Sequence, residues 1–171
     1  VLRATTPYHS KRKENSAEHS WHLALSVITL AEEGKEEIDL LKCLKMALIH
    51  DLVEIEAGDQ IVYQEDPHKF ERELEAAKNI FSFLNPNLGR ELLDIWIEFE
   101  KKESKEAKFV SGIDRYLPLM SNIYSQGKAS WKEHQVTKDM VYKVNESPIK
   151  EALPKLWEAT KKEIDNHFNK D

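Results

Sequence analysis

The chain has 171 residues, enough for one domain with a substantial core, and its 25 basic and 31 acidic side chains give a net charge of −6. Hydrophobic residues make up 40% and charged residues 33%, a composition that excludes an intrinsically disordered chain. The acidic balance argues against a nucleic-acid polymer as partner, because such binding needs a basic surface. A small anionic substrate is still compatible if a bound cation supplies positive charge.

The single cysteine, Cys43, excludes an internal disulfide and a metal site built from several thiolates. It fits a reducing compartment. No apolar stretch approaches the ~20 residues that cross a bilayer, and no secretory signal pattern is recognisable. We therefore expect a cytoplasmic protein without a membrane partner.

Helical periodicity accounts for most of the chain. After a polar, partly basic opening segment, Asn15 and Glu18 predict a capping box that begins a helix over residues 16–33. Further helices are expected over residues 38–54, 68–84, 90–100, 105–127 and 149–168.

Residues 57–67 are expected to form a loop, and residues 128–147 show no clear pattern. Five glycines, six prolines and the lack of an alternating strand pattern favour long helices over strands. We predict an all-α, single-domain helical bundle of roughly six or seven helices over residues 1–171.

The segment "IHDLVEIEAGD", residues 49–59, places unusual charge at the end of a core helix. Imidazole and carboxylate are ligands for borderline divalent metals, and His50 and Asp51 could both reach an ion lying beside the helix. Taken alone, such a pair more often marks a helix end that emerges into solvent. Glu54 would share a broad helix face with both residues, where it could orient a water or shuttle a proton.

Two distant residues strengthen the metal hypothesis. His19 lies in the first turn of its expected helix, with His22 one turn further on; each alone is more often a partly buried polar residue. A histidine that faces a His-Asp pair on another helix is, however, how helical bundles build interior metal sites. Asp114 interrupts an apolar stripe, where a carboxylate costs several kcal/mol unless it is paired or metal-bound. The alternative for Asp114 is a residue at a helix kink near Gly112 that bonds free backbone groups.

The order His19, His50–Asp51, Asp114, in "SAEHSWH", "LIHDLVE" and "GIDRYLP", resembles the HD-domain metal-dependent phosphohydrolases, an all-α family. The resemblance covers roughly residues 3–126. "RKENSAEHS" and "IHDLVEIEAGD" resemble in particular the small bacterial 5′-deoxyribonucleotidase-like branch, whose members dephosphorylate deoxyribonucleoside 5′-monophosphates and usually form homodimers. The resemblance implies that His19, His50, Asp51 and Asp114 hold one divalent cation, which could be Co, Mn, Fe, Ni, Zn or Mg.

The resemblance also implies a catalytic role for Glu54, and a role for Asp59 in positioning the substrate or the attacking water. Arg3 and Arg12 are candidate substrate-phosphate contacts in the basic stretch before the first site helix. The nucleotidases carry an Arg-Trp pair ahead of the first metal-binding histidine. This chain has Arg3 but no tryptophan before Trp21.

We expect a metal-dependent phosphohydrolase that acts on (deoxy)ribonucleoside 5′-monophosphates, with the metal-site core at about residues 15–126 and a C-terminal helix at about 149–168. One alternative is an HD-type hydrolase of another nucleotide or phosphate ester. The other is a non-catalytic helical interaction module. The expected partners are a small phosphorylated substrate and a second copy of the chain in a homodimer.

Overall fold

The computed structural model describes residues 1–7, 10, 12–58 and 66–169, and the regular structure in these ranges is helical. The α-helices are α1 (Ser16–Leu30), α2 (Leu40–Ile49), α3 (Glu54–Ala57), α4 (Lys69–Ser82), α5 (Pro86–Lys101), α6 (Lys105–Tyr124), α7 (Lys138–Ala152) and α8 (Pro154–Phe168). A 3₁₀ turn, Ala31–Glu33, follows α1. The expected all-α fold is confirmed, with the α3 helix only 4 residues long.

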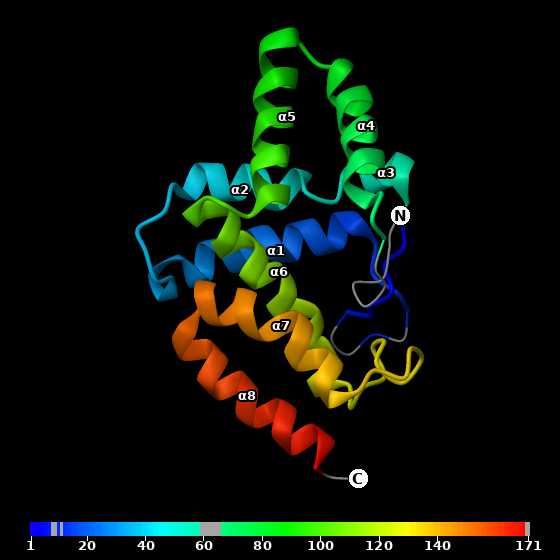
Figure 1. Ribbon diagram of the computed structural model, residues 1–171, viewed down its shortest axis with the longest axis vertical. Helices are drawn as coiled ribbons and strands as arrows, with labels where there is room; N and C mark the ends of the chain where they lie inside the picture. Colours follow the sequence, from blue (N-terminus) through cyan, green and yellow to red (C-terminus); the bar gives the residue numbers. More distant parts are fainter. Residues whose placement is uncertain (8–9, 11, 59–65, 170–171) are drawn as a thin grey trace.

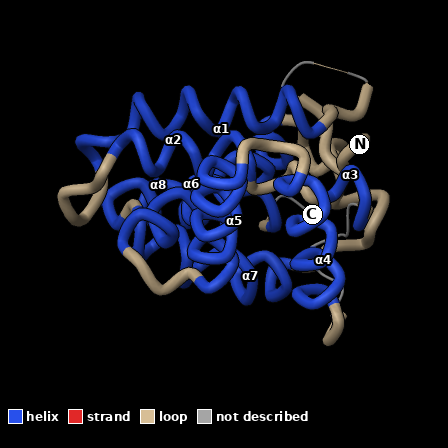
Figure 2. The backbone as a smooth tube through the Cα atoms, turned by 90° about the horizontal axis from the view of Figure 1, so that it is seen from above, coloured by secondary structure: helices blue, strands red, loops and turns tan. Residues whose placement is uncertain are grey.

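The helix α6 lies at the centre of the arrangement. In Figure 1, α1 and α2 run side by side across the middle of the molecule, the pair α4 and α5 projects at one end, and α7 and α8 lie at the other. The view from above shows α1 and α2 as an outer layer (Figure 2). Helix α6 contacts α1, α2, α5, α7 and α8. A polar side chain on α6 can therefore lie close to residues from several other helices.

Two clusters of buried side chains stabilise the fold. The larger cluster includes Leu23 of α1, Trp96 of α5 and Val110 of α6, all fully buried. The smaller cluster joins Leu119 near the end of α6 to Trp157 of α8 and its neighbours. The α6 helix therefore contributes to both. None of the described helices combines the length and the apolar character needed to span a bilayer.

The helix expected over residues 38–54 is wrong at its C-terminal end. Helix α2 ends at Ile49, and the chain then tightens into single turns, with Leu52 N–H donating to the Ile49 carbonyl at 3.0 Å. The Glu54 N–H donates in the same way to the Asp51 carbonyl at 3.2 Å, where the short α3 begins. Bonds of this i to i−3 type turn the chain more sharply than an α-helix does.

The C-terminal helix expected over residues 149–168 is wrong as well, because the structure contains two helices there. Pro154 begins α8, and the residue before a proline is disfavoured in helical geometry. Leu153 accordingly has φ −135° and ψ 64° and separates α7 from α8. Pro148, by contrast, is accommodated inside α7.

A buried asparagine organises the stretch after α6 that showed no sequence pattern. Asn122 is 1% exposed, and its Oδ1 accepts from the backbone N–H groups of Ser130 and Trp131 at 2.9 and 3.0 Å. Its Nδ2 donates to the Pro118 carbonyl and to Ser130 Oγ, both at 3.0 Å. One side chain therefore fixes this loop against α6, and no helical or strand periodicity would reveal that.

Helices α6 and α7 approach each other closely at Gly112. A Cβ atom at this position would lie 2.3 Å from Ala152 Cβ and 2.7 Å from the Pro148 carbonyl oxygen. Both are far shorter than van der Waals contact, so the two helices can pack at this distance only around glycine.

We predict that Gly112→Ala lowers the free energy of unfolding by about 1–3 kcal/mol, because the Pro148 backbone cannot move aside as a side-chain tip could. Chemical denaturation followed by circular dichroism measures the change. Asn87→Ala, at an exposed position in the first turn of α5, is the control and should change stability by less than about 0.5 kcal/mol. Equal stability of the Gly112→Ala variant and wild type would contradict the packing argument.

Candidate metal centre

A short antiparallel backbone ladder brings the start of the chain to the start of α1. Arg3 N–H donates to the Glu14 carbonyl at 2.9 Å, and Glu14 N–H donates to the Thr5 carbonyl at 3.0 Å. The predicted capping box at Asn15 and Glu18 is confirmed and fixes the first turn of α1. The ladder thereby holds the side chains of Arg3 and Glu14 beside His19.

Four predicted ligand residues converge from three segments of the chain. His19 Nε2 of α1 lies 2.9 Å from Asp114 Oδ1 of α6. His50 Nε2, just after α2, lies 3.0 Å from Asp51 Oδ1 and 3.7 Å from Asp114 Oδ1. Potential ligand atoms of His19, His50 and Asp51 are within 4.8 Å of one another, and Asp114 joins them through both histidines.

The surroundings of His50 leave one ring nitrogen directed at the carboxylates. Its Nδ1 lies 3.0 Å from the Ala47 carbonyl oxygen, which can only accept, so Nδ1 carries the proton and the Nε2 of the neutral ring has a lone pair. Burial lowers the pKa of His50 and outweighs the nearby Asp114, which favours the neutral ring. Trp96 Nε1 donates to the His50 carbonyl at 3.2 Å, and Phe99 packs edge-on against the ring.

Glu14 is a site residue that the sequence reasoning missed. Its Oε1 lies 3.5 Å from His19 Nδ1, opposite the nitrogen that faces Asp114. Burial alone would lower the pKa of His19, but its interactions with Asp114 and Glu14 raise it. A carboxylate behind a histidine is the arrangement that orients imidazole ligands toward metals. Glu14 precedes the capping residue and belongs to no helical face, so periodicity gave no signal for it.

Asp51 is buried and Asp114 is partly buried, with its side chain 14% exposed. Burial alone would raise the pKa of Asp114, but its interactions with His19 and His50 hold this pKa well below the usual range. Arg3 Nη1 donates to Asp51 Oδ2, the oxygen opposite the one near His50, and Arg3 Nε lies 3.5 Å from Glu14 Oε1. Arg3 is therefore the cation that joins the acids at the edge of the cluster.

The donor set fits a divalent cation. Two imidazole nitrogens and two carboxylates, with side chains between 1% and 14% exposed, crowd into one small volume. His50 Nε2 is enclosed and makes no hydrogen bond of acceptable geometry in the described part of the chain. A lone pair aimed at carboxylate oxygens needs a proton or a cation between them, and nitrogen and oxygen ligands of this kind suit borderline divalent metals.

The other predicted site residues lie at different distances from the cluster. Glu54 is 8% exposed and begins α3, held to Asp51 through the backbone. Helix α2 ends before these residues, but the Glu54 N–H donates to the Asp51 carbonyl at 3.2 Å, so Glu54 lies one tight turn beyond Asp51. Asp59 lies outside the described residues. Arg12 is at the surface and pairs with Glu18, which lowers the pKa of Glu18 to about 2.

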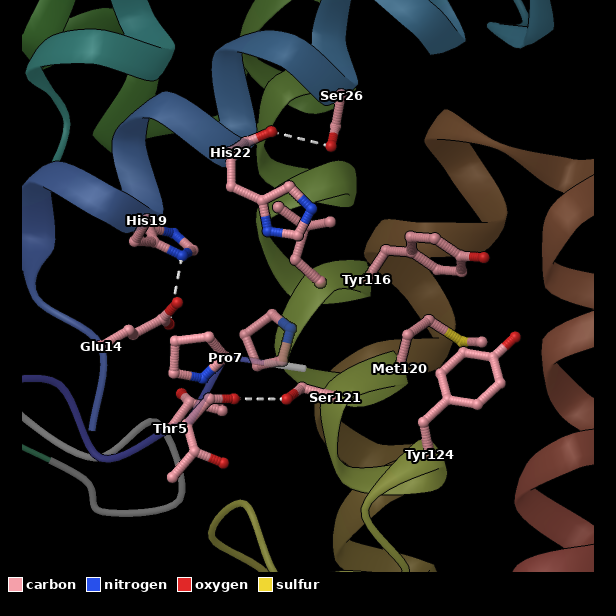
Figure 3. Close-up of a pocket in the computed structure, with 13 residues that line it drawn as sticks. Thr5, Pro7, Glu14, His19, His22, Ser26, Tyr116, Met120, Ser121 and Tyr124 are labelled. Carbon is pink, nitrogen blue, oxygen red and sulfur yellow. Dashed lines mark hydrogen bonds and ion pairs between the residues drawn. The ribbon is translucent and has the colours of Figure 1, made fainter. Parts of the chain in front are cut away.

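A cavity of about 550 Å³ adjoins the Glu14 side of His19 (Figure 3). Figure 3 shows Glu14 pointing toward His19, and His22 and Tyr116 reaching the cavity from α1 and α6. His22 is therefore separate from the metal-ligand group and lines this cavity. The other lining residues are Thr5, Thr6, Pro7, Ser26, Leu117, Pro118, Met120, Ser121 and Tyr124.

Known proteins share both the sequence pattern and the fold. Over 109 residues the chain is 32% identical to human 5′-deoxynucleotidase HDDC2, a match that covers 61% of this chain and 51% of the relative. It is 29% identical over 128 residues to the yeast 5′-deoxynucleotidase YGK1, covering 70% of this chain and 57% of the relative. The chain thus spans about half the length of these curated relatives.

A crystal structure from Magnetospirillum magnetotacticum MS-1, named as a predicted metal-dependent phosphohydrolase, superposes with a TM-score of 0.93. It is 37% identical, and the match covers 99% of this chain and 85% of that one. The family model described as HD domain matches residues 1–157, which include every residue of the cluster. The chain therefore belongs to the HD-domain family.

Proposed function

We propose that the protein is a metal-dependent phosphohydrolase that removes phosphate from (deoxy)ribonucleoside 5′-monophosphates. The observation that carries this proposal is the convergence of His19, His50, Asp51 and Asp114 in one buried cluster. The names of the relatives, 5′-deoxynucleotidases and a metal-dependent phosphohydrolase, support the substrate class and the reaction. We further propose that residues 1–171 act as one domain, since α6 contributes to both buried clusters.

His19, His50, Asp51 and Asp114 would hold the divalent cation, whose identity among Co, Mn, Fe, Ni, Zn and Mg is open to experiment. The chemistry that such a cation supplies is a lower pKa for a bound water and compensation of the phosphate charge. The residues behind the ligands keep the donors in place. Ala47 fixes the His50 ring, and Glu14 orients His19.

Glu54 is proposed as the catalytic acid–base residue. It is a buried carboxylate one turn beyond Asp51, so it could take a proton from the attacking water and return it to the leaving alkoxide. We propose Asp59, which follows α3 in sequence, as a second acid that positions the substrate or the water.

Arg3 and Arg12 are both proposed to contact the substrate phosphate, and the structure favours Arg3 over Arg12. A guanidinium carries five N–H donors, and Asp51 and Glu14 engage only part of those on Arg3, so donors are left for a phosphate oxygen. Arg12 would first have to release Glu18. Arg3 therefore couples the substrate to the ligand Asp51, whereas Arg12 does not.

A phosphate-release assay across Co, Mn, Fe, Ni, Zn and Mg, on nucleotides and simple phosphate esters, tests the proposed function. We expect 5′-monophosphates to be hydrolysed, His50→Ala to lose both metal and activity, and Glu54→Gln to retain metal while kcat falls about 10²–10⁴-fold. Metal content of the same samples is measured by mass spectrometry. Better turnover of another phosphate ester would establish the alternative HD-type hydrolase. The proposal would be contradicted if the wild-type protein bound no divalent metal or hydrolysed no phosphate ester.

Arg3→Ala is predicted to destabilise the metal-free protein by about 3–5 kcal/mol, because Asp51 and Glu14 are then buried without their cation. Adding a divalent metal should recover part of this loss, as the ion supplies positive charge beside Asp51. The matched control is Arg12→Ala, which removes a solvent-exposed Arg–Glu pair and should have a much smaller effect. Denaturant unfolding with and without metal measures both; equal effects would contradict the role given to Arg3.

We propose that the protein is a cytoplasmic homodimer and that α1 and α2 form the interface. Trp21, Leu25 and Ile28 make an exposed apolar stripe on α1, with Trp21 66% exposed. Leu41 and Leu48 are exposed in the same way on the neighbouring α2. Exposed apolar side chains on neighbouring helices are typical of association sites, and the two helices form an outer layer (Figure 2).

Trp21→Glu should convert the dimer to a monomer, since a charge placed in an apolar interface cannot be desolvated cheaply. Light scattering coupled to size-exclusion chromatography gives the mass. Phe83→Glu is the matched control, because Phe83 is 81% exposed at the far end of α4 and lies on neither stripe. A wild-type monomer, or a Trp21→Glu dimer, would rule out this interface.

A further inference from the structure

A second, smaller cavity of about 300 Å³ lies where α5 ends and α6 packs against α7. Its lining residues are Lys102, Lys108, Ser111, Arg115, Val144, Ser147, Pro148 and Glu151. Arg115 follows Asp114 on α6, and adjacent helical side chains point about 100° apart. None of the metal-cluster residues lines this cavity, so it is separate from the metal centre.

The cavity is cationic although the chain as a whole is acidic. Three basic side chains and one acidic side chain line it, in a protein with net charge −6. Lys108 Nζ pairs with Glu151 Oε1 at 2.8 Å, which neutralises that acid. Lys102 and Arg115 make no ion pair within the part of the chain that the structure describes. Two unpaired cations therefore border the same small space.

The backbone holds Lys102 in a conformation that a lysine rarely adopts. Lys102 ends α5 with φ 54° and ψ 33°, in the left-handed region, with its N–H directed to the carbonyls of Glu98 and Phe99. This position commonly holds glycine, because a side chain there is strained. Partial desolvation and the proximity of Arg115 lower the pKa of the Lys102 ammonium group, although the residue as a whole is exposed. Both the strain and the repulsion oppose folding unless something else offsets them.

A buried hydroxyl completes the lining. Ser111 is 3% exposed and lines the cavity from α6. Ser147 adds a second hydroxyl from α7. A hydroxyl can donate to an anionic oxygen, and a guanidinium and an ammonium group together match the double negative charge of a phosphate. The two unpaired cations and the two hydroxyl groups therefore favour the same kind of ligand.

We propose that this cavity is a second binding site that takes the phosphate group of a small molecule, held by Lys102, Arg115 and Ser111. A cavity of about 300 Å³ exceeds the size of one phosphate, so an attached organic group has room between α6 and α7. The site does not depend on the proposed hydrolase function. It lies on the helix that carries Asp114, so a bound ligand contacts the same element as the metal centre.

Titration of the full chain with inorganic phosphate, followed by the backbone amide signals of Lys102 and Ser111 in NMR spectra, tests the site. Potassium chloride at equal ionic strength is the reference for simple screening. We expect saturable shifts with phosphate alone, and about tenfold weaker binding in Lys102→Asn and Arg115→Gln. Asparagine tolerates the left-handed backbone at position 102, so this variant keeps the turn. The matched control, Lys101→Gln, removes an exposed charge next to the cavity and should bind like wild type.

Two further measurements separate this site from the metal centre and from a structural role. In a His50→Ala background the phosphate response at Lys102 should persist, because it does not need the metal. In phosphate-free buffer Arg115→Gln should melt at the same temperature as wild type or higher, since it removes repulsion from Lys102. Loss of the response in His50→Ala, a response equal in chloride, or equal weakening in Lys101→Gln would overturn the proposal.

Discussion

The hydrogen bond between His19 and Asp114 is the interaction on which the rest of the structure depends. It joins the first long helix to α6 inside the protein, 95 residues apart in sequence, and both groups are largely withdrawn from water. A buried carboxylate is tolerated only where positive charge or hydrogen-bond donors meet it. Three features supply this compensation. The backbone ladder positions Glu14 and Arg3, the turn after α2 directs His50 toward Asp114, and α6 packs against α1 and α2.

The charge distribution of the molecule is compatible with the proposed action of an acidic protein on an anion. The overall charge of −6 disfavours a phosphorylated substrate at long range. Positive charge is instead concentrated at Arg3, where a cation bound to the cluster would add to it, while Lys102 and Arg115 provide a second local concentration. Net charge therefore says little about the ligands of this chain. Where the uncompensated charges lie is more informative.

Much of the fold, and the residues that the structure brings together at the candidate site, could be predicted from sequence for physical reasons. Helical periodicity reveals amphipathic helices, and Asp114 stood out because it interrupts an apolar stripe. The end of α2 could not be predicted, because His50 and Asp51 continue a helical pattern while the backbone turns at them. Glu14 and Asn122 were missed, since Glu14 lies outside any helix and acts through His19, while Asn122 acts through hydrogen bonds to the loop after α6. Tertiary contacts made by single polar residues leave no periodic pattern in the sequence, so helical periodicity cannot reveal them.

The packing at Gly112 has a consequence for reading related sequences. Position 112 is limited by the backbone of α7, and position 114, two residues later, is limited by the buried histidines. Both should therefore vary little among homologues that keep this helix crossing, although only one bears on chemistry. A relative that lost the cluster but kept the fold would still retain the glycine. Invariance along this short stretch of α6 would therefore record two independent selective pressures and would not outline an active site.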